Sequence, residues 1–284
     1  MQEASHIESA RKIGAARPGL LRRLRRALGP LGRYRPDFLR KNMAAGFKSC
    51  DLRVLPDWAR CLKSPEERLL DQLDLSGRVV YDIGAHTGDY SLYFSRRVGP
   101  EGWVISFEPQ PYSYAKLERN LRLNQIRNVR PFPLALGRRR ERKPIYMLPG
   151  MPTTASLAVE ARTRLRRQCG EAQVTPLDQL MNRHPLPVPD LIKIDVEGLE
   201  WEVLEGAGHC LSRHHPSLLI EIHGADREHK SERTRQMAGY LTGLGYSLLH
   251  AESGVDFEHC APRIASGHLF AQYVTLKAEQ RLIS

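Results

Sequence analysis

The chain has 284 residues, 41% of them hydrophobic and 26% charged, which is ordinary for a globular protein with a sizeable core. No apolar run approaches the ~20 residues that a bilayer-spanning helix needs, so we expect no transmembrane helix. The net charge of +11 would suit a nucleic-acid-binding protein, but the basic residues gather in an N-terminal arm and two short clusters, 138–143 and 162–167. Because the basic residues are so localised, we expect no nucleic-acid groove.

Residues 1–45 are predicted to form a separate basic extension. Residues 11–41 hold eleven Arg or Lys against one acid, and a short apolar stripe of leucines runs through residues 20–28. The arm would suit contact with an anionic membrane surface or an acidic partner, or it packs on its own domain or stays partly disordered. We expect the latter, because the stripe is short and has no aromatic anchor.

The five cysteines are scattered and form no C-x-x-C pair, which indicates reduced thiols rather than a disulfide framework or a zinc site. The first fourteen residues lack the apolar segment of a secretory signal. We therefore expect a cytoplasmic protein, with membrane association through residues 11–41 left open.

Residues 46–284 are predicted to form one α/β domain. From Leu69 onward strand and helix signals alternate, the pattern of a mainly parallel sheet covered on both faces. In the first half, strands are expected at 78–83, 103–107 and 128–136, with helices at 89–98 and 113–124. Pro131 and Pro133 require the third strand to be at an edge or broken.

The second half begins with an irregular segment, 138–175, that we interpret as an inserted hairpin or lid. A short helix follows, with Thr175 as its predicted cap. Further strands are expected at 190–195, 216–224, 246–251 and 268–277, with helices at 200–211 and 231–243.

The stretch VVYDIGAHTGDYSLYF is typical of a buried strand that turns tightly into a helix around a ligand. Gly84 and Gly88 allow a sharp turn and the close approach of a bound molecule. His86 occupies the position of the second glycine in a G-x-G-x-x-G dinucleotide turn, where it would crowd a pyrophosphate. The ligand therefore need not carry phosphates.

Two acids lie at the ends of consecutive predicted strands. Asp82 would repel phosphate but suits an amine or a sulfonium charge. Glu108, 20 residues beyond Gly88, is placed to accept hydrogen bonds from two ribose hydroxyls. Together these features describe S-adenosylmethionine.

Four segments in this order, VYDIGAHTGDYSLYFS, FEPQPYSYAKLERNLRLN, NVRPFPLALG and IKIDVEGLEWEVLEGA, resemble the FkbM family of S-adenosylmethionine-dependent methyltransferases. The resemblance covers residues 66–276. It implies a Rossmann-like class I methyltransferase sheet of seven strands, the last antiparallel, and O-methylation of sugars or secondary metabolites. The predicted cofactor-binding residues are Asp82, Gly84, Ala85, His86, Thr87, Gly88, Glu108, Pro109, Leu136 and Asp195.

A second acidic cluster is expected beside the transferring methyl group. Asp195, Glu197, Glu221 and His223 follow two neighbouring strands, and we favour Asp195 or His223 as the base that accepts the hydroxyl proton. A divalent ion held by these carboxylates is left open. We expect Lys193 to form an ion pair with Glu221. The acids Glu200, Glu202 and Glu205 are interpreted as the solvated face of the next helix.

The predicted acceptor is a small molecule or a glycan. Thr153, Thr154 and Ser156 would bind a polar acceptor or form a simple polar loop, and the arginines of 162–167 suit an anionic one. An RNA methyltransferase that uses the basic arm is the alternative, although the chain has few aromatic residues for stacking. A third hypothesis is a non-enzymatic peripheral protein.

Overall fold

The computed structural model describes residues 65–148, 151–157, 166–223, 226–251, 255–256 and 267–273. The predicted basic extension, residues 1–45, lies outside the described residues, as do residues 162–165 of the second basic cluster. Within the described part of the chain, no helix has the length and apolar character that crossing a bilayer requires.

The main sheet has the strand order β11-β10-β12-β9-β8-β1-β2-β3. Strand β12 is antiparallel to both of its neighbours, while the strands from β9 to β3 are parallel to one another. The predicted seven-stranded sheet with an antiparallel last strand is therefore confirmed, and the two-residue β11 extends its edge. The strand bounds are β1 Val79–Ile83, β2 Trp103–Phe107, β3 Val129–Phe132, β8 Leu191–Ile194, β9 Ser217–Glu221, β10 Tyr246–His250, β11 Val255–Asp256 and β12 His268–Tyr273.

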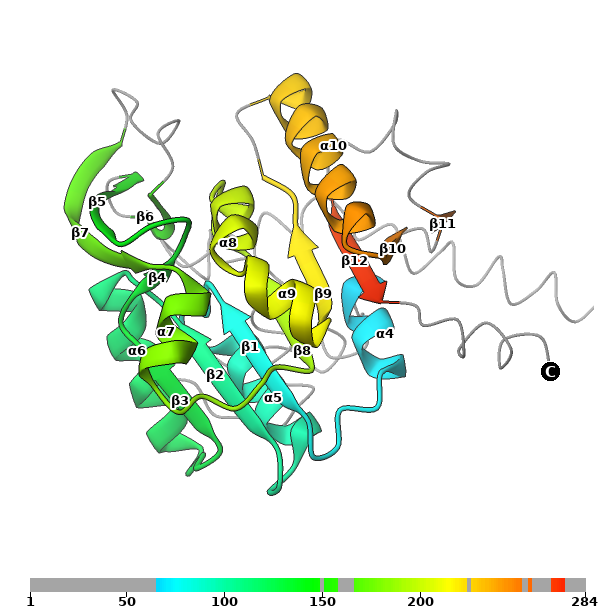
Figure 1. Ribbon diagram of the computed structural model, residues 1–284. Helices are drawn as coiled ribbons and strands as arrows, with labels where there is room; N and C mark the ends of the chain where they lie inside the picture. Colours follow the sequence, from blue (N-terminus) through cyan, green and yellow to red (C-terminus); the bar gives the residue numbers. More distant parts are fainter. Residues whose placement is uncertain are drawn as a thin grey trace, which may run out of the picture. The chain divides into compact units, whose positions relative to one another are not determined.

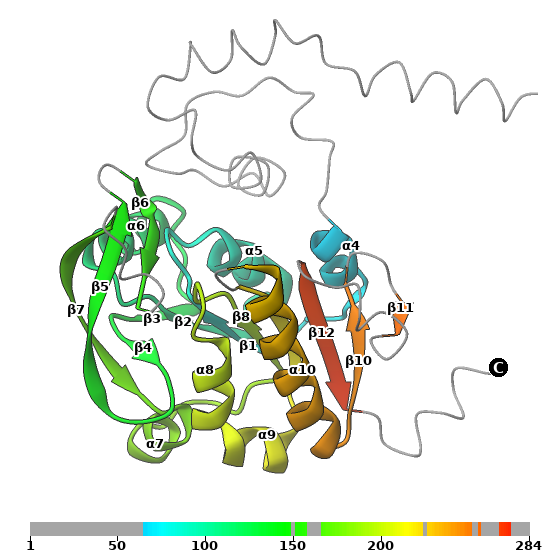
Figure 2. The same cartoon turned by 90° about the horizontal axis from the view of Figure 1, so that it is seen from above.

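Helices cover both faces of this sheet, as predicted (Figures 1 and 2). One face carries α4, α5 and α6, and the other carries α7, α8, α9 and α10. The central strand β1 is buried on both sides, so its residues alternate between two cores: Val80 packs with α4 and α5, while Tyr81 and Ile83 join the larger core. The helix bounds are α4 Pro65–Gln72, α5 Asp89–Val98, α6 Pro111–Leu123, α7 Leu177–Arg183, α8 Glu200–Gly206, α9 Gly208–His214 and α10 Arg227–Gly243.

The proline-containing segment 128–136 is both at an edge and broken. Strand β3 ends at Phe132, and β4 Ala135–Leu136 joins a second sheet with the order β4-β7-β5-β6. This sheet contains β5 Glu141–Leu148, β6 Met151–Ser156 and β7 Arg167–Thr175. Strands β5 and β6 form an antiparallel hairpin, which confirms the predicted inserted hairpin.

Two local predictions are wrong. The helix expected at 200–211 is two helices, α8 and α9, which meet at Ala207. Thr175 does not cap α7: it ends β7, the N-cap position is Pro176, and no side chain caps this helix. The Thr175 hydroxyl is buried without a hydrogen-bond partner. Thr175 is thus part of strand β7 and not the N-cap residue that the sequence pattern predicts.

Candidate active site

The turn after β1 is fastened to the end of β2. The amides of Gly84 and Ala85 both donate to the Phe107 carbonyl at 2.9 Å, and the His86 amide donates to Glu108 Oε2 at 2.8 Å. His86 itself has φ +51°, a left-handed conformation that costs a residue with a side chain about 1 kcal/mol. The turn and the acid that follows β2 are therefore held as one unit.

The two glycines of the turn are required by contacts within the protein. A Cβ on Gly84 would lie 1.8 Å from the Asp195 carbonyl oxygen, and one on Gly88 would lie 2.5 Å from Leu117 Cδ1. Both residues also have positive φ, +85° and +94°. We expected a ligand to use this space, but in this structure the backbone after β8 and a side chain of α6 fill it.

Glu108 is a buried carboxylate at the carboxyl end of β2, with 6% of its surface exposed. Its Oε1 accepts from the Gln110 amide at 2.8 Å, and its Oε2 accepts from His86. Burial raises its pKa to about 7; the two backbone hydrogen bonds oppose this rise, and the charges of Asp82 and Asp195 add to it. Glu108 is thus held rigidly beside the turn, where we predicted it.

Asp82 is fully buried and contacts other residues of the protein. Its Oδ2 accepts a 2.6 Å hydrogen bond from Ser91, whose hydroxyl also lies 2.8 Å from that of Ser106. The Asp82 carboxylate lies 3.9 Å from Lys193 Nζ. Direct contact between Asp82 and a ligand stays a prediction, and in this structure its charge acts on Lys193 and Glu108.

Lys193 is a buried cation between the two acids Asp82 and Asp195. Its Nζ lies 3.1 Å from Asp195 Oδ2 and 4.4 Å from the ring centroid of Tyr90. Burial opposes its charge, but the nearby carboxylates outweigh that effect and raise its pKa. The ion pair with Glu221 stays a prediction: the sheet register sets Lys193 beside Asp82 on β1, and the charge of Glu221 contributes to the raised pKa of Lys193.

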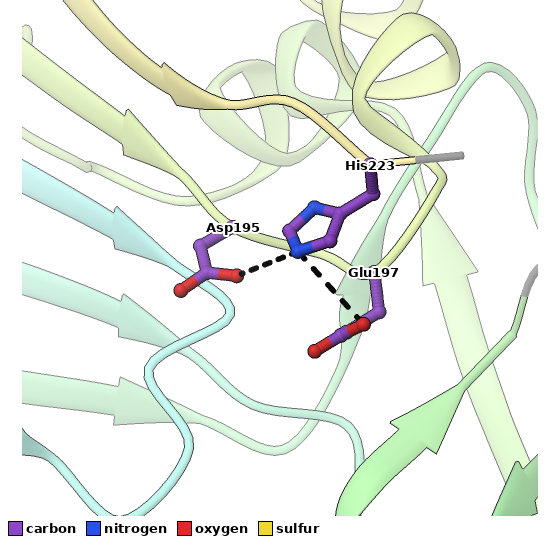
Figure 3. Close-up of side chains that lie close together, drawn as sticks. All are labelled: Asp195, Glu197 and His223. Carbon is purple, nitrogen blue, oxygen red and sulfur yellow. Dashed lines mark ion pairs between the residues drawn. The ribbon is translucent and has the colours of Figure 1, made fainter. Parts of the chain in front are cut away.

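The structure brings together the four residues that we proposed for proton transfer. Around His223 Nε2 lie Glu221 Oε1 at 3.5 Å, Glu197 Oε2 at 3.8 Å and Asp195 Oδ1 at 3.9 Å. Figure 3 shows the imidazole directed between Asp195 and Glu197. Asp195 and Glu197 follow β8, Glu221 is the last residue of β9, and His223 follows β9. Because these two strands are parallel, they place the four side chains at one edge of the sheet, as expected.

Glu200 is a member of this cluster that the sequence interpretation missed. It was assigned to a solvated helix face, but it is 1% exposed and its Oε1 lies 2.9 Å from His223 Nδ1. The same oxygen accepts from the Gly198 amide at 3.0 Å. The spacing of residues along the helix indicates the burial of Glu200, because Glu200 shares a helix face with the buried Val203 and Leu204, three and four residues later.

The charge state of His223 bears on its proposed role as base. Burial disfavours its charged form, but Glu200, Asp195 and Glu197 outweigh burial and raise its pKa to about 9. A group with that pKa is a cation at neutral pH and cannot accept a proton. Of the two bases that we favoured, Asp195 is therefore the one that this arrangement supports.

The remaining predicted cofactor residues differ in accessibility. Ala85 and Thr87 are buried within the turn, and the Thr87 carbonyl accepts from Asn120 Nδ2 at 2.8 Å. Pro109 is partly exposed beside Glu108. Leu136 packs in the larger core with 1% of its surface exposed, so its side chain is not open to a ligand in this structure.

Comparison with known proteins identifies the family. A family model described as the methyltransferase FkbM domain matches residues 82–248, more than half of the chain. The chain belongs to this FkbM family. The match includes the turn, Glu108 and the cluster around His223, so all three lie within the family's shared domain.

Individual relatives of this FkbM-family chain are distant. Methyltransferase 1 of Beauveria bassiana is 29% identical over an alignment of 143 residues that covers 45% of this chain and 57% of the relative. Hexuronic acid methyltransferase AglP of Haloferax volcanii is 26% identical over 149 residues, which are 51% of this chain and 56% of the relative. The chain thus spans less than two thirds of the length of these curated relatives.

A solved structure agrees on the fold. The crystal structure of methyltransferase FkbM from Methylobacillus flagellatus KT matches with a TM-score of 0.50 and 18% identity. The match covers 86% of this chain and 60% of that chain. The class I methyltransferase fold predicted for the FkbM-family chain is therefore confirmed.

Proposed function

We propose that this protein is an S-adenosylmethionine-dependent O-methyltransferase that acts on a hydroxyl group of a glycan or of a glycosylated or secondary metabolite. The observation that carries the proposal is Glu108, a buried carboxylate hydrogen-bonded to the amides of His86 and Gln110 at the carboxyl end of β2. Membership in the FkbM family supports methyl transfer as the reaction.

The cofactor's ribose is assigned to Glu108. Each of its carboxylate oxygens accepts one backbone N–H, and a carboxylate oxygen has a further lone pair with which to accept a ribose hydroxyl. The sulfonium is assigned to the negatively charged region near Asp195. Methyl transfer to oxygen depends mainly on alignment, which can supply about 7–11 kcal/mol.

The acceptor hydroxyl must lose its proton as the new bond forms. Asp195 is our proposed base, since it is partly exposed and lies at the sheet edge where the methyl group would be transferred. Lys193 holds one of its oxygens at 3.1 Å, and the other faces His223. A base positioned in this way is worth about 10²–10⁴ in rate.

A sugar is the acceptor class that we favour. The Haloferax volcanii relative is named a hexuronic acid methyltransferase. The exposed arginines Arg138 to Arg140, in the bend between β4 and β5, would suit an acidic sugar, with Arg138 also paired to Glu205 and Arg139 to Glu141.

Calorimetric titration with S-adenosylmethionine and S-adenosylhomocysteine tests the cofactor. We expect both to bind the wild type and the Glu101→Ala control, in which an exposed acid is removed, and to bind Glu108→Ala at least tenfold more weakly, because two ribose hydrogen bonds are lost. No heat from either compound with folded wild-type protein would overturn the proposal. Incubation with labelled cofactor and fractionated uronate-bearing glycans then tests the acceptor.

An RNA methyltransferase is the second candidate, favoured by the net charge of +11 and the arginine-rich residues 11–41. RNA held by several arginines binds with a steep salt dependence. A filter-binding titration that is flat with salt would reject this candidate and leave the glycan proposal standing. Liposome co-sedimentation, with and without residues 1–45, tests membrane contact of the arm separately.

A further inference from the structure

We propose that Asp195, Glu197 and His223 form a binding site for a divalent cation of the Mn²⁺ class. Their ligand atoms, one from each side chain, all lie within 4.8 Å of one another. The inference does not rest on the proposed function, because it concerns binding of an ion and needs no methyl transfer for its test. A bound ion would occupy the Asp195 oxygen that faces His223, so the role of Asp195 as a base belongs to the ion-free protein.

The first support is an unsatisfied nitrogen. His223 Nε2 is buried and has no hydrogen-bond partner, although three carboxylate oxygens surround it. Their distances of 3.5–3.9 Å are too long for hydrogen bonds. Buried polar atoms in native proteins nearly always have a hydrogen-bond partner, so a buried nitrogen without one indicates that a ligand binds here. An ion between this nitrogen and the carboxylates would replace the Nε2 proton and give the nitrogen a partner.

The second support is the way in which His223 is held. Its other nitrogen, Nδ1, lies 2.9 Å from the buried Glu200, which is itself fixed by the Gly198 amide. A carboxylate behind the far nitrogen of a ligating histidine is the usual arrangement in metal sites, because it fixes the ring and its tautomer. The arrangement directs Nε2 into the space between Asp195 and Glu197 (Figure 3).

The two carboxylate ligands are also positioned by specific contacts. Lys193 holds Asp195 Oδ2 at 3.1 Å, which leaves Oδ1 on the side of His223. Glu197 has φ +54°, a strained backbone conformation for a residue with a side chain, and Arg233 binds the carbonyl of the next residue, Gly198. Strain of this kind persists where the surrounding structure requires it, and it gathers at functional sites.

The donor set indicates the class of ion. Two carboxylates and one imidazole offer mixed oxygen and nitrogen ligands, which suit Mn²⁺ better than an ion restricted to oxygen. Ligand atoms next to each other around such an ion are ~3 Å apart, so each must move inward by up to about 1 Å. Rotation of the partly exposed Asp195 and Glu197 side chains allows this movement. Glu221, 3.5 Å from Nε2, adds a negative charge beside the ion.

Paramagnetic resonance of the full-length, chelator-treated protein titrated with Mn²⁺ tests the site. We expect one saturable ion per chain, with hyperfine coupling to a directly bound imidazole nitrogen. Glu197→Gln should bind the ion at least tenfold more weakly. His223→Ala should lose the nitrogen coupling. Glu202→Gln, on the same segment but outside the cluster, is the matched control and should behave like the wild type.

Three results would overturn the proposal: no saturable binding at millimolar Mn²⁺, binding that Glu197→Gln leaves unchanged, or a bound ion without nitrogen coupling in the wild type. The Glu197 side chain is 35% exposed, so its glutamine variant is expected to fold, which circular dichroism checks. Cofactor titrations without metal are scored separately, so failure of the metal site is distinct from failure of the proposed methyl transfer.

Discussion

Replacing Glu108 with glutamine removes a buried acid whose pKa is raised from 4.5 to about 7. Each pKa unit corresponds to about 1.4 kcal/mol, so the rise from 4.5 to about 7 means that the ionised carboxylate costs the folded state about 3–4 kcal/mol. The acid is fully buried, so solvent screening does not reduce this value substantially. Glutamine also loses one backbone hydrogen bond, because its amide nitrogen cannot accept, and this loss is the same at every pH.

The sign follows from proton binding. Between pH 4.5 and about 7 the folded state keeps the Glu108 proton while the unfolded state has released it, so this residue lowers stability as the pH rises. Above about pH 7 both states are ionised and the contribution is constant. The free energy of unfolding of Glu108→Gln, relative to the wild type, should therefore rise by about 2–3 kcal/mol between pH 5 and pH 8, the rest of the effect lying below pH 5.

Urea denaturation of cofactor-free protein at a series of pH values measures this difference. Groups that do not interact with Glu108 titrate equally in the wild type and the variant, so they cancel in the comparison. Glu101→Gln, an exposed position, should run parallel to the wild type. Parallel curves for Glu108→Gln and the wild type would refute the reasoning, because the carboxylate would then ionise as it does in the unfolded chain.

Three further substitutions test the supports of the site. Gly84→Ala should destabilise the protein by about 2–5 kcal/mol, measured by thermal unfolding, because its Cβ would lie 1.8 Å from the Asp195 carbonyl oxygen; a wild-type melting temperature would contradict this. Lys193→Met should cost about 3–5 kcal/mol in urea denaturation because it leaves two carboxylates without their cation, and adding Asp82→Asn should recover part of the loss; no recovery would mean that the two residues are not coupled. Glu197→Gly should be more stable than Glu197→Ala by about 1 kcal/mol because φ is +54°, and equal stabilities would exclude backbone strain there.

Much of the fold was predictable because its signals are local. The helix predicted at 89–98 has those bounds in the structure, since Gly88 and Gly99 flank it and both have positive φ. The strand predicted at 103–107 is also exact. Pro131 and Pro133 predict the break between β3 and β4, because proline cannot donate a backbone hydrogen bond in a central strand.

The sequence predicts most residues of the site but not which of these residues contact one another. Lys193 faces Asp82 on β1 and Leu219 on β9, and Glu221 lies two residues further along β9. That register depends on how the strands align, which no single segment encodes. The raised pKa of His223, against the effect of its burial, likewise comes largely from its hydrogen bond to Glu200 and the charge of that residue. Predicting this contact requires treating α8 as an amphipathic helix with Glu200 on its buried face.

The second sheet has a consequence for how this fold can diversify. The chain leaves the main framework at β4 and returns at the end of β7, where Ala135 pairs with Val174 and Leu136 with Thr175. The two ends of the excursion are therefore adjacent, and lengthening such a loop twofold costs only about 0.6 kcal/mol of closure entropy. We therefore expect changes of length within residues 138–173 to be tolerated while the strand ends that carry Glu108 and Asp195 keep their positions.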